Sequence, residues 1–259
     1  MNKDNNSSQK TGQGELRNKI RFKFSKTGSY KYFSHLDIIS IISRAIRRAN
    51  IRVKYSEGFN PKPRLSFGPP TSLGIESHAE YGDIILADGL EPEDFLIRLN
   101  DVLHNELKIE KAVRILNPVK SIMSQTDIIK YSIYPDPGRT VQRGKGSDSY
   151  GLPEPESSQK DILNSLRGLL SDENGLTSRG IYKFEEIENA GNSGQVVINL
   201  LGYAKILKDV ESKVFKFGEF KVLLDEVCKE QGIDNIKIIK EELYIICGER
   251  LVTPFEILL

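Results

Sequence analysis

The sequence predicts an α+β protein built from two tandem ferredoxin-like domains, each a βαββαβ unit with an antiparallel sheet. Three observations lead to this prediction. Apolar residues between 20 and 116 recur with the periods of a strand, a helix, two strands, a helix and a strand in turn. A looser version of this order follows between 127 and 246. The length of 259 residues suits two domains of about 100 residues or more.

The first strand and the first helix have the clearest patterns. In residues 20–25, Ile20, Phe22 and Phe24 alternate with polar or basic residues, which is typical of a half-buried strand. Ser34 is a suitable helix N-cap, and Asp37 stands three residues later, where the acid of a capping box lies. The helix is expected to stop at Asn50. Its expected apolar stripe consists of Leu36, Ile39, Ile41 or Ile42, Ile46 and Ala49.

Shorter patterns predict the rest of the first domain. The expected elements are a strand at 51–55, a Gly- and Pro-rich connection to Gly74, a strand at 80–86, a helix at 91–106 and a strand at 107–116. Pro92 suits the first turn of the second helix. The expected buried face of that helix is Phe95, Leu96, Leu99, Val102 and Leu103.

The second half is expected to repeat this order around an insertion. Residues 136–160 are rich in Pro, Gly and Ser, which favours a flexible segment. The expected elements are a strand at 127–134, a helix at 161–170, a hairpin of 181–187 with 195–203, a helix at 217–231, and strand material, in one piece or two, at 236–246. The expected organisation is a disordered lead at 1–18, one domain at 19–120 and a second at 127–259.

Composition favours a folded protein without a membrane helix. Hydrophobic residues make up 38% of the chain and charged residues 28%. No apolar run approaches the roughly 18 residues of a membrane span, and the polar first 19 residues lack the apolar core of a secretory signal. Cys228 and Cys247 have no metal-binding spacing, so we expect two buried thiols in a cytoplasmic protein.

The near-neutral net charge of +1 hides a strong local imbalance. Residues 21–64 hold eleven Lys and Arg against two acids, whereas residues 65–110 hold ten acids against two bases. Such asymmetry can mark a face that binds a polyanion. It fits equally well with two segments that pack together and neutralise each other.

The basic segment carries the strongest binding pattern. Its candidate nucleic-acid-binding residues are Arg44, Arg47, Arg48, Arg52, Lys54, Lys62 and Arg64. The aromatic residues near them in sequence are Tyr30, Tyr32, Phe33, Tyr55 and Phe59. Basic and aromatic side chains together suit single-stranded RNA, because charges follow the phosphates while rings stack on bases. The alternative is a solvated helix face with its aromatic residues in the core.

The stretch YSEGFNPKPRLSF, residues 55–67, interrupts the predicted strands. Its candidate loop residues are Tyr55, Ser56, Gly58, Phe59, Asn60, Pro61 and Pro63. Gly58 permits a positive φ, and the two prolines stiffen the path. Phe59 is expected to anchor the loop on the core, while Lys62 and Arg64 extend the basic face. A phosphate-bearing chain suits this loop better than a nucleotide cofactor does.

Histidines supply two further candidates. His35 and Asp37 lie just inside a helix start, where an imidazole beside a carboxylate can act as general acid or base. The alternative is that Asp37 only completes the cap. Glu76, His78 and Glu80 alternate on a predicted strand, so they share a face whose side chains suit a divalent cation together with His35. A plain surface patch is favoured there, and no metal is expected; His104 is expected to be exposed.

Cofactor motifs are absent from the sequence. It contains no GxGxxG, GxxxxGK[ST], GxSxG or HExxH pattern, so no cofactor is expected. Two cysteines are too few to hold a radical-SAM iron–sulfur cluster on this chain.

Several short motifs occur in order over residues 20–86: SKTG, SHLD, RRA, YSxGFNPxP and LGxES. Together they resemble the radical-SAM-linked protein family, a bacterial domain of unknown function often fused to, or encoded beside, radical-SAM and cobalamin-type proteins. The resemblance implies a role beside a radical-SAM partner or in RNA metabolism, and it assigns no catalytic residue.

Three functional hypotheses follow. The first is an RNA-binding or substrate-presenting accessory module without catalysis of its own. The second is an enzyme that processes or modifies RNA with His35. The third is a protein-interaction adaptor whose acidic stretch, residues 76–110, docks a basic partner.

Overall fold

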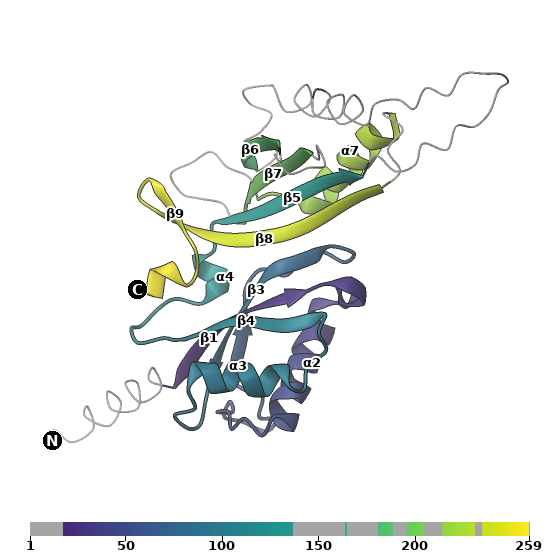
Figure 1. Ribbon diagram of the computed structural model, residues 1–259. Helices are drawn as coiled ribbons and strands as arrows, with labels where there is room; N and C mark the ends of the chain where they lie inside the picture. Colours follow the sequence, from purple (N-terminus) through teal and green to yellow (C-terminus); the bar gives the residue numbers. More distant parts are fainter. Residues whose placement is uncertain are drawn as a thin grey trace, which may run out of the picture. The chain divides into compact units, whose positions relative to one another are not determined.

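The computed structural model describes residues 18–136, 164, 181–188, 196–204, 214–230 and 235–258 (Figure 1). The chain divides into two compact units, Met1–Asp127 with Lys240–Leu259, and Ile128–Ile239. The predicted insertion after residue 136, the helix predicted at 161–170 and the lead before residue 18 lie outside the described residues. The domain boundaries proposed at 120 and 127 remain predictions.

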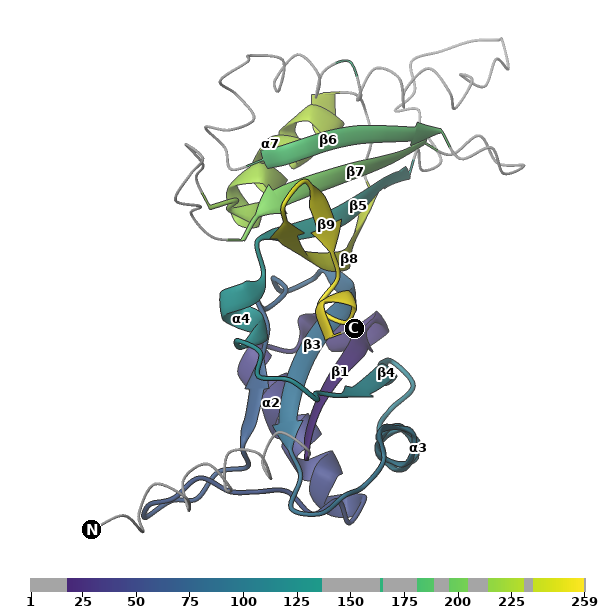
Figure 2. The same cartoon turned by 90° about the vertical axis from the view of Figure 1, so that its left-hand side faces the viewer.

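The first unit is an antiparallel sheet with helices. Strand β1 lies between β4 and β3 (Figure 2). Strand β2 pairs with the other edge of β3, at Gly82, Asp83 and Ile84. Strand β8 follows β3 in the sheet order, and β9 pairs with β8. The elements are β1 (Lys19–Lys26), the 3-10 helix η1 (Gly28–Tyr32), α2 (His35–Arg48), β2 (Leu65–Phe67), β3 (Glu76–Ile85), α3 (Pro92–Asn100), β4 (Leu107–Arg114), α4 (Ile122–Gln125), β8 (Asn235–Cys247), β9 (Arg250–Val252) and the 3-10 helix η2 (Glu256–Leu258). Strand β8 belongs to this unit from Lys240 onward.

Helices α2 and α3 pack on one face of this sheet. The alternation predicted for β1 is confirmed, because Ile20, Phe22 and Phe24 are buried in one core with both helices. The helix stripe is partly wrong. Leu36 is 73% exposed, and Ile38 takes its place in the core. Two residues correspond to about 200° around a helix, so the two side chains leave it on nearly opposite sides.

Two further boundaries differ from the prediction. Residues 51–55 form no continuous strand but only the isolated bridges of Val53 with Leu86 and of Tyr55 with Pro63. The second helix was expected to reach residue 106, yet α3 stops at Asn100. The Asn100 amide donates to the Ile109 carbonyl at 2.9 Å and accepts from the Ile109 N–H at 2.8 Å. These bonds tie the helix end to β4.

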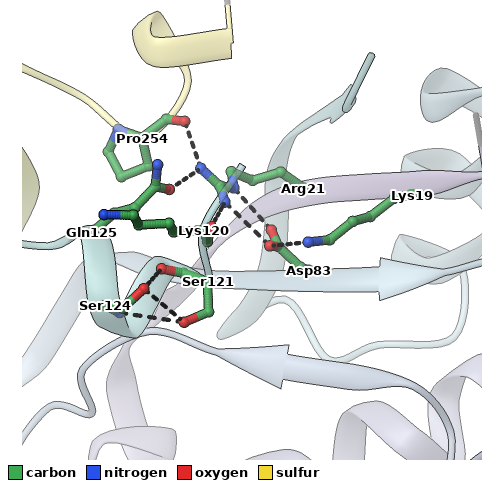
Figure 3. A network of polar contacts seen from close by, with 8 residues as sticks. All are labelled: Lys19, Arg21, Asp83, Lys120, Ser121, Ser124, Gln125 and Pro254. Carbon is green, nitrogen blue, oxygen red and sulfur yellow. Dashed lines mark hydrogen bonds and ion pairs between the residues drawn. The ribbon is translucent and has the colours of Figure 1, made fainter. Parts of the chain in front are cut away.

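The opposite face of β1 carries a buried polar network (Figure 3). The Arg21 side chain is fully buried and meets Asp83 on β3 through two bonds, Nε to Oδ1 at 2.8 Å and Nη2 to Oδ2 at 3.1 Å. Its Nη1 donates to the Pro254 carbonyl at 3.0 Å and to Gln125 Oε1 at 3.3 Å. Lys19 adds an ion pair to Asp83 at 3.1 Å. Arg21 therefore holds the sheet, α4 and the C-terminal segment together.

The second unit contains strand β7 (Val196–Tyr203) between β5 (Ile128–Asp136) and β6 (Ile181–Glu188), with antiparallel pairing throughout. The predicted hairpin of β6 with β7 is confirmed, as is the helix α7 (Phe217–Glu230). Strand β8 is one continuous element of 13 residues, not two pieces. An aromatic cluster fills part of this core and consists of Tyr131, Phe215, Phe217 and Phe220.

The chain is thus α+β with antiparallel strand pairs, as predicted. Cys228 on α7 is buried, but Cys247, at the end of β8, is exposed, so the prediction of two buried thiols is wrong for the second. Within the described ranges, no helix is long and apolar enough to cross a membrane.

Candidate functional site

A β-bulge shapes the region beside the start of α2. Phe24 pairs with Glu80, whereas Lys26 pairs with Ser77. Two steps on β1 therefore match three steps on β3, so β3 carries the extra residue and β1 keeps its alternation. Phe24 lies in the core under the helices. Lys26, two residues further on β1, and Glu80, the direct partner of Phe24, lie on that same face.

Glu80 is the centre of a buried polar cluster. Its Oε1 accepts a bond from the Thr71 hydroxyl and another from Lys240 Nζ at 3.0 Å. Lys240 is fully buried and also donates to the Pro69 carbonyl at 2.7 Å. Burial acts to raise the pKa of the Glu80 carboxyl, but Lys240 and hydrogen bonds from Thr71 and Ser77 outweigh it, and the net pKa is lowered. Glu80 is therefore ionised at neutral pH.

Lys26 is the second buried lysine of this cluster, with 3% of its surface exposed. Among the residues that the structure describes, its ammonium has no hydrogen-bond acceptor within bonding distance and no ion pair. Burial lowers the pKa of Lys26, Glu80 opposes this effect, and Lys240 adds to it. Lys26 is the unusual member of the cluster, because its stem is buried while its ammonium reaches solvent without a partner among the described residues.

His35 is the first residue of α2 and lies close enough to Glu80, Lys240 and Lys26 for their charges to affect its pKa. Its imidazole is half-buried and packs edge-on against the Phe67 ring, with centroids 5.7 Å apart. Burial lowers the pKa of His35; Glu80 raises it, while Lys240 and Lys26 lower it further. The imidazole is therefore neutral at pH 7 and carries both a donor and an acceptor nitrogen.

Asp37 forms the predicted capping box. Its Oδ2 accepts from the Ser34 N–H at 3.0 Å and from the Ser34 hydroxyl at 2.6 Å, and its own N–H donates to Ser34 Oγ at 3.2 Å. The hydrogen bond from the Ser34 side chain is the main cause of the lowered pKa of Asp37. The cap interpretation is confirmed, while the catalytic role of His35 with Asp37 stays a prediction.

The three alternating residues of β3 have separate partners. Glu76 Oε1 accepts from the Gly28 N–H at 3.3 Å, His78 Nδ1 lies 3.6 Å from Glu241 Oε2, and Glu80 is buried as described. The bulge breaks the period of two on which the shared face depended. No group of metal-binding side chains is found in the described part of the chain. His104 is exposed, as predicted, and stacks on Tyr30.

The predicted basic residues lie on the outer side of α2 and in the segment that follows it. All are exposed except Lys54, which is half-buried. Some have structural partners. Arg48 Nη2 donates to the Val102 carbonyl at 2.8 Å, and Arg52 pairs with Asp88 at 2.9 Å. Lys54 and Arg64 also have partners. The candidates on the surface are Arg44, Arg47, Arg48, Arg52, Lys62 and Arg64.

Residues 55–63, which we name the arm, project from the sheet between β2 and the end of α2. Its base is closed by the Ser56 N–H donating to the Lys62 carbonyl at 2.8 Å and the Arg64 N–H donating to the Lys54 carbonyl at 2.8 Å. The predicted positive φ of Gly58 is confirmed at 119°. Phe59 does not anchor the arm on the core as expected, because it is fully exposed at 113%.

Exposed apolar side chains surround the start of α2. Tyr32 is 67% exposed, Leu36 73% and Leu73 63%. The Gly74 N–H donates to the Lys31 carbonyl at 2.9 Å, which places the turn carrying Leu73 beside η1. His35 therefore lies at the edge of a buried charge cluster and within an apolar rim.

Sequence reasoning missed Lys26, Thr71, Ser77 and Lys240. Lys26 and Ser77 belong to the SKTG and LGxES motifs, which were the available signal for them. Lys240 had no such signal, because it lies 160 residues from Glu80 in sequence.

Comparison with protein families identifies a bacterial family. Residues 19–190 match the model of a family described as "Uncharacterized protein conserved in bacteria (DUF2344)". No curated protein matches the chain.

Proposed function

This chain belongs to that bacterial family, and from this premise we propose that it is an RNA-binding module that presents RNA to a separate enzyme. The observation that carries the proposal is Phe59, a fully exposed aromatic ring at the tip of an arm whose base is closed by hydrogen bonds. The last turn of α2 is basic and ends at Arg48, and residues 49–54 lie between it and this arm.

The arm is built to hold Phe59 in solvent. The Tyr55–Pro63 bridge and the Lys62 N–H bond to Ser56 Oγ at 3.0 Å fix both ends of the short loop. A ring held in this way loses little conformational entropy when a base stacks on it. Base–aromatic stacking is largely independent of sequence, so it suits a module that accepts many RNAs.

Charge supplies the second part of the binding surface. Arg44 and Arg47 are exposed on α2, and Lys62 is exposed on the arm. Lys and Arg that neutralise phosphates release counterions, so the affinity for RNA depends steeply on salt. Asp83 pairs with Arg21 and Asp88 with Arg52, so these acids neutralise two bases of the basic segment. Among the described residues, Arg44, Arg47 and Lys62 take part in no ion pair, so their charge stays available for phosphates.

The partner in this proposal is a radical-SAM enzyme. The motifs of residues 20–86 resemble a family linked to such enzymes, and two cysteines cannot hold the required cluster on this chain. Both cysteines are free thiols, which suits the reducing cytoplasm.

We also propose that both units are ferredoxin-like. The strand order β4–β1–β3–β2, with α2 and α3 on one face, is the order this architecture needs in the first unit. In the second unit β5, β7 and β6 pair in the corresponding way. The helix needed between β5 and β6 falls outside the described residues.

RNA binding can be measured by fluorescence anisotropy of a labelled mixed-sequence single-stranded RNA with the full chain. The Phe59→Ala variant should bind about 5- to 150-fold more weakly, the equivalent of losing one stacked base. The Lys62→Ala variant should weaken binding and reduce the slope of log affinity against log salt by about one. Ile97→Ala and Lys108→Ala, exposed residues on α3 and β4, are matched controls that should bind like the wild type.

Two results would count against RNA as the ligand. The first is an affinity that does not change between about 50 and 200 mM salt. The second is a Phe59→Ala variant that binds RNA normally but no longer co-purifies, after RNase treatment, with a protein that the wild type retains. The second result would replace RNA binding with the adaptor role.

The neutral imidazole of His35 favours a second candidate, an RNA-processing or RNA-modifying enzyme with His35 as general base. In that case His35→Ala abolishes turnover of RNA and leaves the melting temperature nearly unchanged. Loss of folding in His35→Ala would instead assign the residue to packing on Phe67.

A further inference from the structure

We propose that Lys26 and His35 bind a phosphoryl group where β1 meets the start of α2. The inference deepens the proposed function, because it takes an RNA or a nucleotide as the molecule that carries the phosphoryl group. It rests on the proposed function for the identity of that molecule alone. Nothing in the sequence-based interpretation assigned a role to Lys26.

A surplus of hydrogen-bond donors marks the site. Lys240 uses two of its three N–H groups, on Glu80 and on the Pro69 carbonyl. The three N–H groups of Lys26 have no acceptor among the described residues. His35 adds a ring N–H. The cluster therefore offers more donors than acceptors, and a phosphoryl group, with three terminal oxygens, supplies what is missing.

The charges point to an anion as well. Lys26 and Lys240 are two lysines with buried side chains, and Glu80, bonded to Lys240, is the one carboxylate bonded to either of them within the described residues. The Lys26 ammonium reaches solvent without a partner among the described residues, so it is available to an anion.

The site is open on the His35 side. His35 is half-buried. In the described ranges, Asp88 Oδ1 is the one side-chain polar atom that is both buried and without a partner. Lys26 Nζ also has no partner there, so it must be accessible to solvent. The exposed ring of Tyr32 and the exposed Leu36 form the rim. A phosphate attached to a base fits this arrangement better than a free carboxylate, because the base can lie on the ring of Tyr32.

The test is a calorimetric titration of inorganic phosphate into the full chain at constant ionic strength. Chloride at the same ionic strength is the reference anion. Wild type should bind phosphate, and Lys26→Met should bind at least about tenfold more weakly, the usual effect of losing a hydrogen bond to a charged group. His35→Gln should show a smaller loss. Lys108→Ala, a change at an exposed lysine on β4, is the control that should leave phosphate binding unchanged.

Two titrations with single-stranded RNA distinguish the sources of the phosphoryl group. An oligonucleotide with a 5′-phosphate should bind more tightly than the same oligonucleotide with a 5′-hydroxyl, and the difference should vanish in Lys26→Met. If both bind equally while inorganic phosphate still binds at Lys26, the terminal phosphate of RNA is not the source. This outcome leaves the Phe59 test of RNA binding unaffected, so the two proposals can fail separately.

A measurement on the wild type keeps the inference testable if Lys26→Met does not fold. Addition of phosphate should shift the amide NMR signals of residues 25–27 and 34–36 and leave the arm unchanged. No heat of binding, or shifts confined to the arm, overturns the site.

Discussion

The buried network around Arg21 allows a double-mutant test of what holds the first unit together. Arg21 and Asp83 are both fully or almost fully buried and meet through two hydrogen bonds. Removing one partner of a buried ion pair leaves an uncompensated charge and typically costs about 3–5 kcal/mol. An ordinary domain is stable by about 5–15 kcal/mol, so each single variant should be severely destabilised.

The structure also predicts the order of the two losses. In Arg21→Met, the Asp83 carboxylate keeps the Lys19 ammonium at 3.1 Å. In Asp83→Leu, the guanidinium keeps only neutral acceptors, the Pro254 carbonyl and Gln125 Oε1 among them. The free energy of unfolding should therefore fall further in Asp83→Leu. The double variant should lose less than the sum of the two, with a coupling of about 0.5–3 kcal/mol.

Urea denaturation followed by circular dichroism and by tyrosine fluorescence measures these losses, since the chain has ten tyrosines and no tryptophan. Two probes are needed because a chain of two units can depart from two-state unfolding. Arg47→Met, the same change at an exposed site, should stay within about 0.5 kcal/mol of wild type. Single variants as stable as this control, or a strictly additive double variant, would refute the reasoning.

Two further predictions concern β3. A Cβ at Gly82 would clash with the Phe22 ring, so Gly82→Ala should reduce the urea-derived free energy of unfolding by about 1–3 kcal/mol. Gly89→Ala, with open space around it, should not, and equal stability of the two variants would contradict this. Because the pKa of Glu80 is lowered, the contribution of its carboxylate to stability is complete above the ordinary pKa of 4.5 and is lost as the pH falls further. Melting temperatures measured against pH should therefore drop more steeply below pH 4.5 in wild type than in Glu80→Gln. Parallel curves for the two proteins would contradict this prediction.

Local patterns were enough to predict most elements of the first unit. The Ser34–Asp37 capping box is contained within four residues, so the sequence alone locates the start of α2. The alternation of Ile20, Phe22 and Phe24 likewise depends only on the strand period, because the bulges beside β1 fall on its neighbours.

Elements whose form depends on a distant partner could not be predicted in this way. Residues 51–55 alternate like a strand, but they meet the end of β3 only through isolated bridges. The prediction that Glu76 and Glu80 share a face was wrong, because the bulge in β3 is defined by its pairing with β1. Phe59 was assigned to the core because of its type, whereas the hydrogen bonds at the base of the arm hold it in solvent.

The candidate site shows the same limit most clearly. His35 was found from sequence, since a histidine at a helix start is visible locally. The lysines around it were not, because β8 brings Lys240 back to Glu80 only after 160 residues. The stem of Lys26 is buried, while its ammonium reaches solvent without a partner among the described residues. An ammonium held in this way beside a half-buried imidazole is available to an anion. Lys26, more than the exposed basic residues, therefore argues that this face of the first unit binds a ligand.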